Sequence, residues 1–475
     1  MSRQTGARRA AGLRRPPGPR INFLLAAIGQ MMPKRFPFDP LAFGLNIARE
    51  HGDIAYYRVG PLQVYQLAHP DLARQILIDQ PDKFHKSRFI RQAFGPFAGD
   101  GLLTSDGALW KQQRKLMQPA FHHAQLVGYG AEMVRHGLRM SDAFADGSVL
   151  EVDAEMAKLT LGIVVQSLFG ADVTGQAEEL GRLMLAVLDA ANQRLNSVVR
   201  TPAWVPTARN LRERRALAAF DEMLYALIAA RRASRDDTRR DLLSMLLAAF
   251  DEDSGVRMSD RQLRDEMMTL FLAGHETTAM ALTWTWYLLS RHPDVEAKLL
   301  DEFRRVLQGR TPTPADLANL PYTEMVVREA MRLYPPAAGV AREPIEDVEI
   351  GGYVVPKGSL VTANIFALHR DPRFFESPER FDPDRFARGW EDRIPRGAYL
   401  PFGGGPRVCI GNGFAMMEAR LILATLAQRW RLMLEPNQEV TPIQLVTVRP
   451  KNGLRMRVEL RTSEVRTPTF SVQPS

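Results

Sequence analysis

The sequence predicts a single, mostly α-helical domain with small β-sheets, and three observations carry this prediction. One helical pattern begins after Ser259 and continues for about 32 residues. Two further helical patterns follow it directly, whereas strand signals occur only as short runs between turn residues. Hydrophobic residues make up 45% of the 475-residue chain and charged residues 24%, so the chain can bury a large core.

The net charge of +8 comes from the first 38 residues, which contain no acidic residue. Their basic residues are Arg3, Arg8, Arg9, Arg14, Arg15, Arg20, Lys34 and Arg35. Without these, 54 basic residues balance 54 acidic ones, so no nucleic acid partner is expected. We expect residues 39–462 to form one globular body, with 1–38 a flexible basic tail and 463–475 a frayed end. The tail could instead be a transit-like peptide or a weak patch for acidic surfaces.

Cys409 is the only cysteine, so the fold cannot depend on an internal disulfide or on an oxidising compartment. The apolar stretch at 21–32 is too short for an integral membrane span, which needs about 20 residues. We therefore expect a soluble, cytoplasmic protein, and a monomer.

The long helix is predicted to start at Ser259, which has capping-box spacing to Gln262. Its apolar residues continue to Leu289, and His292-Pro293 ends the pattern. At 1.5 Å per residue such a helix spans roughly 48 Å, against about 10–14 residues for an average helix, so it must cross the whole domain.

The elements that follow are bounded by proline and glycine. The pattern predicts a helix from Asp294 to Leu307 that ends at Gly309, and a helix from Pro321 to Tyr334 that Pro335-Pro336 stops. A hairpin is predicted at residues 348–350 and 353–355 around Gly351-Gly352, followed by a turn at 356–358 and a strand at 359–363.

The first candidate site is the glycine-rich segment from Phe402 to Gly411, which contains Cys409. A phosphate loop would need different glycine spacing. The alternative is a loop that brings backbone N–H groups to the sulfur of Cys409, just before a helix that includes Phe414. A helix N-terminus and the adjacent Arg407 both favour a thiolate. Taken alone, a single cysteine such as Cys409 is more often a buried, inert residue.

The pattern Phe-x-x-Gly-x-Arg-x-Cys-x-Gly resembles the haem-binding signature of the cytochrome P450 family, and the resemblance extends over about residues 39–460. Its fixed positions are Phe402, Gly405, Arg407, Cys409 and Gly411. The resemblance implies the cytochrome P450 fold, with haem b between the long helix and the cysteine loop. Cys409 would then be the axial ligand of the haem iron.

The second candidate site is the segment 273–278, in the middle of the long helix. Gly274 costs a helix about 1 kcal/mol relative to alanine, and such a local conflict often marks a functional site. The alternative is a kink with threonine hydroxyls bonded back to earlier carbonyls. The resemblance implies that Glu276 relays protons, that Thr277 supplies an alcohol, and that Ala273 and Gly274 leave room for dioxygen.

The third candidate site is Glu329 with Arg332, because Glu329 falls within an apolar stripe and the pair is expected to be buried. The resemblance implies that a later arginine completes a structural network beneath the haem. Arg380 and Arg385 both have suitable sequence contexts, and we choose Arg385 because its distance to Cys409 fits the family pattern better.

The fourth candidate set would bind the haem propionates, which need cationic donors. It consists of Trp110, Arg114, Arg342 and Arg407. His122, His123 and His369 are interpreted as ordinary structural or surface histidines.

The sequence thus predicts an oxidoreductase that inserts one oxygen atom of O2 into a C–H or C=C bond of a lipophilic substrate. No flavin or nicotinamide pattern follows the cysteine motif, so electrons are expected from a ferredoxin or flavodoxin-type donor with its reductase. A peroxide-dependent peroxygenase and a non-catalytic gas-binding haem protein are the alternatives, and neither needs the pair Glu276 and Thr277. Substrate contacts are expected at 89–97, 185–199, 270–273 and 337–340, which suit a fatty acid, terpenoid, steroid or polyketide.

Overall fold

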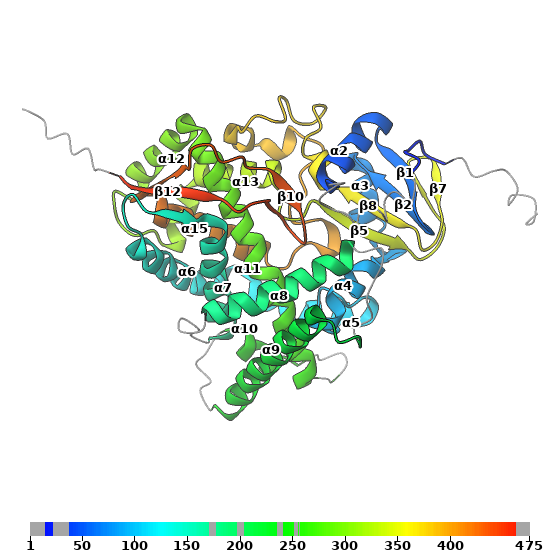
Figure 1. Ribbon diagram of the computed structural model, residues 1–475, viewed down its shortest axis with the longest axis horizontal. Helices are drawn as coiled ribbons and strands as arrows, with labels where there is room; N and C mark the ends of the chain where they lie inside the picture. The colour runs from blue at the N-terminus through cyan, green and yellow to red at the C-terminus, as the bar shows by residue number, and fades with distance from the viewer. Residues whose placement is uncertain are drawn as a thin grey trace, which may run out of the picture.

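The computed structural model describes residues 15–21, 38–170, 177–196, 204–234, 241–250, 255 and 257–461. Helices make up most of it (Figure 1). They are α2 (Pro40–His51), α3 (Pro70–Arg74), α4 (Arg88–Ala98), α5 (Gly107–Met117), α6 (His123–Ala143), α7 (Val152–Phe169), α8 (Ala177–Asn196), α9 (Ala208–Ala233), α10 (Leu242–Ala248), α11 (Asp260–Arg291), α12 (Pro293–Val306), α13 (Pro321–Leu333), α14 (Ile365–Leu368) and α15 (Asn412–Ala427).

The largest sheet has five strands in the order β1-β2-β8-β5-β3 and lies with α2 on the right of Figure 1. Its strands are β1 (Ile54–Val59), β2 (Leu62–Leu67), β3 (Phe84–Lys86), β5 (Gly339–Pro344) and β8 (Leu360–Asn364). Strands β2 and β8 are parallel, and the other neighbours are antiparallel. The smaller sheets contain β4 (Val149–Glu151), β9 (Trp430–Leu434) and β12 (Arg455–Leu460), then β6 (Val348–Ile350) with β7 (Tyr353–Val355), and β10 (Pro442–Gln444) with β11 (Val448–Pro450).

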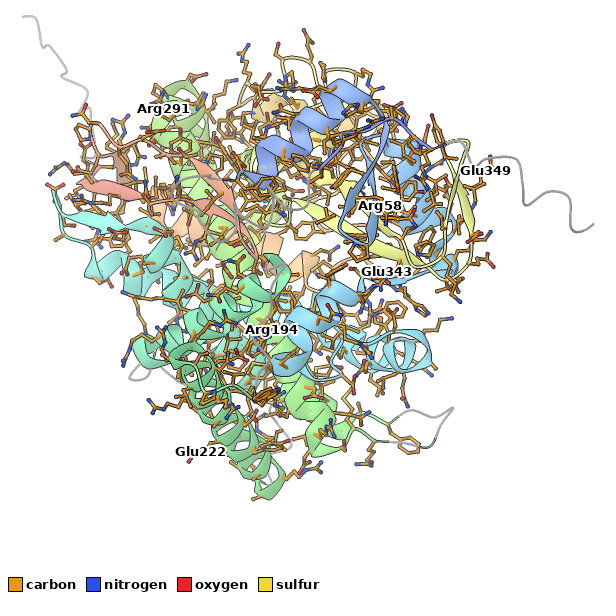
Figure 2. All side chains as sticks on the ribbon, turned by 45° about the vertical axis from the view of Figure 1, so that its right-hand side comes forward. Arg58, Arg194, Glu222, Arg291, Glu343 and Glu349 are labelled. Atoms are coloured by element: carbon orange, nitrogen blue, oxygen red, sulfur yellow. The ribbon has the colours of Figure 1, made fainter. Side chains whose placement is uncertain are left out.

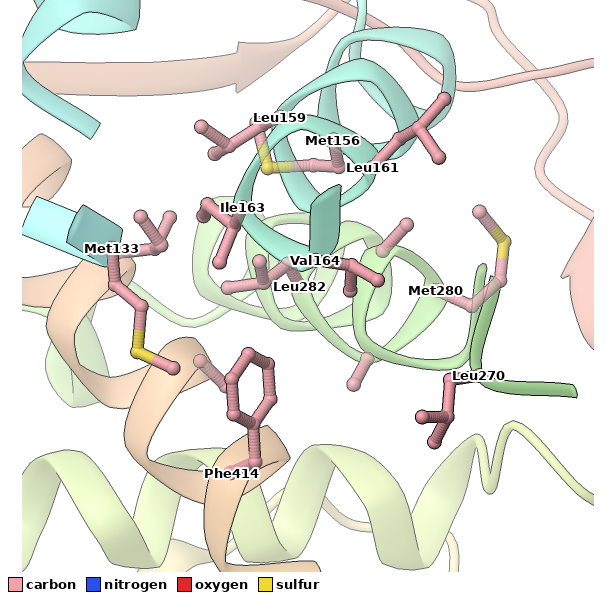
Figure 3. Packing of buried hydrophobic residues seen from close by; sticks show 14 of the residues in the cluster. Met133, Met156, Leu159, Leu161, Ile163, Val164, Leu270, Met280, Leu282 and Phe414 are labelled. Carbon is pink, nitrogen blue, oxygen red and sulfur yellow. The ribbon is translucent and has the colours of Figure 1, made fainter. Parts of the chain in front are cut away.

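Helix α11 runs through the centre of the molecule, and its predicted length of about 32 residues is confirmed. Its capping box is formed in both directions between Ser259 and Gln262. Most of its side chains are buried because α7 packs along it, which Figure 3 shows for Val164 of α7 and Leu282 of α11. Phe414 of α15 lies nearby in the same view. A helix buried on nearly all sides can hold side chains at fixed positions in the core.

The other predicted elements are confirmed with small shifts of their ends. Helices α12 and α13 end close to the predicted residues, and the hairpin of β6 and β7 pairs Ile350 with Tyr353. Gly351 and Gly352 have φ values of 57° and 78°, which a tight two-residue hairpin turn requires. Within the described ranges, no helix is long and apolar enough to cross a membrane.

The predicted basic tail lies largely outside the described residues, as does the predicted frayed end at 463–475. The described part, residues 15–21, packs on β1, where the N–H of Tyr56 donates to Pro17 O at 2.9 Å. Figure 2 labels two charged side chains at the periphery, Arg291 of α11 near the top and Glu222 of α9 near the bottom of the view.

Candidate active site

A cavity of about 400 Å³ lies between α11 and the segment that contains Cys409. On α11, Ala273 is exposed and Gly274 and Thr277 are partly exposed, although the helix around them is buried, because these residues form the cavity wall. The cavity is bordered mainly by apolar side chains, so it suits an apolar ligand with few polar contacts.

The cysteine segment is held in place through Gly405. This glycine has a φ of 69°, and a Cβ there would lie 1.9 Å from the carbonyl oxygen of Leu77, in the π-helix η2 (Gln75–Asp79). Only glycine can occupy such a position without moving the backbone. The N–H of Cys409 donates to Phe402 O at 3.0 Å, and the thiol borders the cavity. The close approach of Gly405 to η2 therefore fixes the turn that presents Cys409.

The cation beside the sulfur is Arg114 rather than Arg407, which corrects the expectation from the sequence. Although the thiol borders the cavity, burial raises the pKa of Cys409, and the N–H of Gly411 and the charge of Arg114 oppose that rise. Arg114 Nη1 also donates to Val408 O at 2.8 Å. Arg407 instead pairs with Asp106 at 2.5 Å and donates to Phe84 O at 3.0 Å.

Among the described residues, the cations that border the cavity are Lys86, Arg114, Arg342 and Arg407. Trp110, the remaining predicted donor, also borders it. Burial, together with the neighbouring charge of Arg407, lowers the pKa of Arg342 to about 10. Such a concentration of buried positive charge fits a ligand that carries two carboxylates, as haem does.

Lys86 is a member of this group that the sequence analysis missed. Its Nζ donates to the carbonyls of Leu102 and Ser105 at 2.5 and 2.8 Å. Burial lowers its pKa to about 7, against the attraction of Asp106. Lys86 reaches the cavity because β3 pairs with β5, which sets it opposite Arg342. No sequence motif marks this residue, and the strand pairing that places it joins segments far apart in the chain.

The predicted acid and alcohol on α11 have different surroundings. The Thr277 side chain borders the cavity, and its hydroxyl donates to Ala273 O at 2.8 Å. Glu276 does not border the cavity. Its Oε1 accepts a hydrogen bond from the Thr447 hydroxyl at 2.7 Å and lies 3.9 Å from Arg449, and its Oε2 has no partner in the described part of the chain. A Cβ at Gly274 would lie 3.1 Å from Val164, so this glycine also permits close packing of α7.

A second carboxyl group, Glu418 of α15, lies near the cavity and was also missed. It is completely buried, and among the described residues neither of its oxygens has a partner within hydrogen-bonding distance. Burial raises its pKa well above the usual range, and the nearby hydroxyl of Thr278 partly opposes this. Thr278 itself borders the cavity. The packing of α15 on α11 creates this contact, which local sequence does not reveal.

Glu329 and Arg332 form an ion pair that is fully buried in α13. Arg332 Nε and Nη2 donate to the two carboxylate oxygens of Glu329 at 2.7 and 2.9 Å. Arg385, in the short helix η6 (Pro383–Phe386), adds its Nε to the same carboxylate at 3.2 Å. Arg380 contributes only its backbone carbonyl, which accepts from Arg332 at 3.1 Å. The three side chains therefore satisfy a buried charge that would otherwise be costly.

Three of the four segments expected at the substrate wall contribute to it. They supply Ile90, Leu270, Ala273, Ala337, Gly339 and Val340. The described part of 185–199 supplies none, and the wall also includes Leu102, Leu103, Val164 and Leu168. Among the histidines, His122 is exposed, as is His123, and His369 is fully buried.

Comparison with known proteins matches the chain to a family model, to named relatives and to solved structures. The family described as Cytochrome P450 matches residues 16–456. Cyclooctatin synthase of Streptomyces melanosporofaciens is 40% identical over 85% of this chain and 88% of its own length. Pentalenene oxygenase of Streptomyces avermitilis is 36% identical over 89% and 93%. Cyclooctat-9-en-7-ol 5-monooxygenase of Streptomyces melanosporofaciens is 35% identical over 83% and 85%.

Solved structures agree with these sequence matches. The haem domain of cytochrome P450DA has a TM-score of 0.85 and 27% identity, over 95% of this chain and 98% of that one. The retinoic acid-bound cyanobacterial CYP120A1 has a TM-score of 0.82 and 27% identity, over 94% and 100%.

Proposed function

The chain belongs to the cytochrome P450 family, and from this premise we propose which residues perform its reaction and which substrate class it takes. It is a haem-dependent monooxygenase, which inserts one oxygen atom of O2 into a lipophilic substrate while electrons and protons reduce the other to water. The observation that carries the assignment of residues is that Cys409 and Thr277 border the same cavity.

We assign haem b to this cavity, where the sulfur of Cys409 would bind its iron. A thiolate-ligated haem supplies electron density that favours cleavage of the O–O bond. Gly405 lets the ligand segment pack against η2, and the N–H of Gly411 and the charge of Arg114 partly offset the burial that raises the pKa of Cys409. Lys86, Arg342 and Arg407, together with Trp110, would supply the donors for the two propionates.

Thr277 and Glu276 are assigned to proton delivery. The Thr277 hydroxyl now donates to its own helix, and rotation of its side chain would let it donate to dioxygen in the cavity instead. Glu276 does not border the cavity. A proton from Glu276 must therefore reach Thr277 through water or through rotation of the Glu276 side chain. The carboxylate of Glu276 instead accepts from the Thr447 hydroxyl and lies near the guanidinium of Arg449.

A ferredoxin or flavodoxin-type protein is the proposed electron donor. A hollow of about 350 Å³ lies on α5 and the turn that follows it, and its lining includes Lys111, Arg114, Lys115 and His122. Arg114 lies in both this hollow and the cavity wall, so the hollow approaches the ligand segment closely. Its positive charge favours an acidic protein partner. A cytoplasmic location is part of the proposal, because the lone Cys409 leaves the fold independent of an oxidising compartment.

A terpenoid is the proposed substrate. The names of pentalenene oxygenase and cyclooctat-9-en-7-ol 5-monooxygenase denote terpenes, and both relatives match most of this chain. The cavity itself is bordered by aliphatic side chains such as Ile90, Leu168 and Leu270, which suit a compact hydrocarbon skeleton.

The test is a spectral titration of the ferric protein with cyclic terpenes and with fatty acids of similar size, followed by turnover with a ferredoxin, its reductase and a nicotinamide cofactor. We expect a terpene to displace the Soret band and to yield a product one oxygen atom heavier. Binding and turnover of fatty acids alone would refute the terpenoid assignment.

A further inference from the structure

His369 lies between two parts of the molecule that the proposed reaction needs. It follows α14, is completely buried, and its ring stacks on Tyr399 with the ring centroids 5.2 Å apart. The sequence interpretation treated it as an ordinary structural histidine. Its hydrogen bonds connect it to the buried arginine network on one side and to the cysteine segment on the other.

On the network side, the contact between His369 and Arg332 is reciprocal. Arg332 Nη1 donates to the backbone carbonyl of His369 at 2.7 Å, and His369 Nδ1 lies 3.3 Å from the carbonyl oxygen of Arg332. Because Arg332 also holds Glu329 in a bidentate pair, His369 is anchored to a rigid, buried group.

On the other side, the N–H of Leu400 donates to His369 Nε2 at 2.9 Å. Two further hydrogen bonds continue into the ligand segment: Gly403 N–H donates to Leu400 O at 3.0 Å, and Cys409 N–H donates to Phe402 O at 3.0 Å. A short series of backbone contacts thus leads from the imidazole to the residue that presents the thiol.

The partners of the ring define its protonation. A backbone N–H needs an acceptor, so Nε2 must be unprotonated, and a carbonyl needs a donor, so Nδ1 must carry the hydrogen. Burial, with the nearby charges of Arg332 and Arg370, lowers the pKa of His369 to about 3, which keeps the ring neutral. Only the neutral tautomer that is protonated at Nδ1 satisfies both bonds.

We infer that His369 is a positioning residue, which fixes the start of the Cys409 segment relative to the network of Glu329, Arg332 and Arg385. This inference rests on the proposed role of Cys409 as the haem ligand. The hydrogen bond from Leu400 N–H to His369 Nε2 positions the segment, rather than the bulk of the histidine side chain.

Two substitutions separate the two bonds. His369→Gln places an amide oxygen near the position of Nε2 and can still accept from Leu400. His369→Asn reaches only as far as Nδ1, so it can still donate to Arg332 O but leaves the Leu400 amide without an acceptor. A buried amide that loses its acceptor destabilises the ligand segment. We expect the rate of haem release to rise about tenfold, equivalent to about 1.4 kcal/mol.

The readouts are the absorption of the reduced carbon monoxide complex and the rate at which haem transfers to an added apo-myoglobin. In His369→Gln, the red-shifted thiolate band should stay dominant. In His369→Asn, part of the complex should absorb at the shorter wavelength of a thiol-ligated form, and haem should leave about tenfold faster. Tyr399→Phe is the matched control, because it removes a neighbouring buried hydrogen bond, from Tyr399 Oη to Arg328 O at 2.9 Å, without touching Leu400.

Each outcome decides the inference. A thiolate band and haem release in His369→Asn that equal those of the wild type would overturn it. So would equal losses in His369→Asn and Tyr399→Phe, or failure of the glutamine and asparagine variants alike to fold. The wild-type spectrum tests the ligand assignment separately, because absence of the thiolate band there would refute the role of Cys409 itself.

Discussion

Glu276 and Thr277 are adjacent on α11, yet only Thr277 borders the cavity, while Glu276 accepts a 2.7 Å hydrogen bond from Thr447. Neighbouring residues of an α-helix differ in direction by about 100°, which lets Thr277 border the cavity while Glu276 points towards its packing partners. The proposed proton path must therefore bridge two faces of the same helix.

Thr277→Ala should keep the haem spectrum, substrate binding and consumption of the nicotinamide cofactor, but it should lose product and release hydrogen peroxide. Without the hydroxyl, the second proton reaches dioxygen at the wrong atom. Each tenfold loss in productive partitioning corresponds to about 1.4 kcal/mol. Measuring product and peroxide per cofactor consumed checks this, with Thr278→Ala as the control. Uncoupling in the control alone would assign the role to Thr278.

Arg332→Ala should be the most damaging change in the buried network, because it leaves the carboxylate of Glu329 buried with a weaker partner, at a cost of about 3–5 kcal/mol. Arg385→Ala should be milder because Arg385 is partly exposed, and Arg380→Ala milder still because only its backbone takes part. Thermal unfolding and the yield of haem-loaded protein provide the ranking. A larger loss in Arg380→Ala than in Arg385→Ala would reverse the assignment.

Gly405→Ala should prevent formation of the ligand segment, because its φ of 69° is unfavourable for alanine and the Cβ would collide with Leu77 O. Gly403→Ala is a matched control. Its φ of 72° is similar, but the nearest atom to an added Cβ is 3.9 Å away, so only the backbone strain of about 1–2 kcal/mol applies. Haem content should fall far more in Gly405→Ala, and equal losses would show that the contact with η2 is unimportant.

Deletion of residues 1–14 should leave haem content and turnover unchanged, because these residues carry none of the motifs. Deletion of 1–20 also removes the hydrogen bond from Tyr56 N–H to Pro17 O and should lower stability by about 1 kcal/mol without changing turnover. Melting temperature and haem content of the two truncated proteins measure this. Loss of haem from the shorter deletion would contradict the prediction.

The features that could be predicted from the sequence are those that local chemistry determines. The capping box at Ser259, the glycines of the β6–β7 hairpin and the proline that opens α13 each act within a few residues, so their elements begin and end close to the expected positions. The cysteine motif also lies within a few residues, and it predicted the part of the cavity wall around Cys409.

The features that could not be predicted depend on contacts between distant segments. Lys86 reaches the cavity through the pairing of β3 with β5, and Glu418 reaches Thr278 through the packing of α15 on α11. Glu276 meets Thr447 from a late loop. No local sequence pattern predicts these contacts, and none predicts the contact between His369 and Leu400.

Cys409→Ser provides the most direct test of the central claim, that this sulfur is the axial ligand of the haem. The measurement is the absorption spectrum of the reduced carbon monoxide complex, compared with that of the wild type at equal haem content. The account predicts that the wild type has the red-shifted band of a thiolate-ligated haem and that Cys409→Ser lacks it. A red-shifted band that persists in Cys409→Ser would contradict the account, because no other residue of the chain can supply a thiolate.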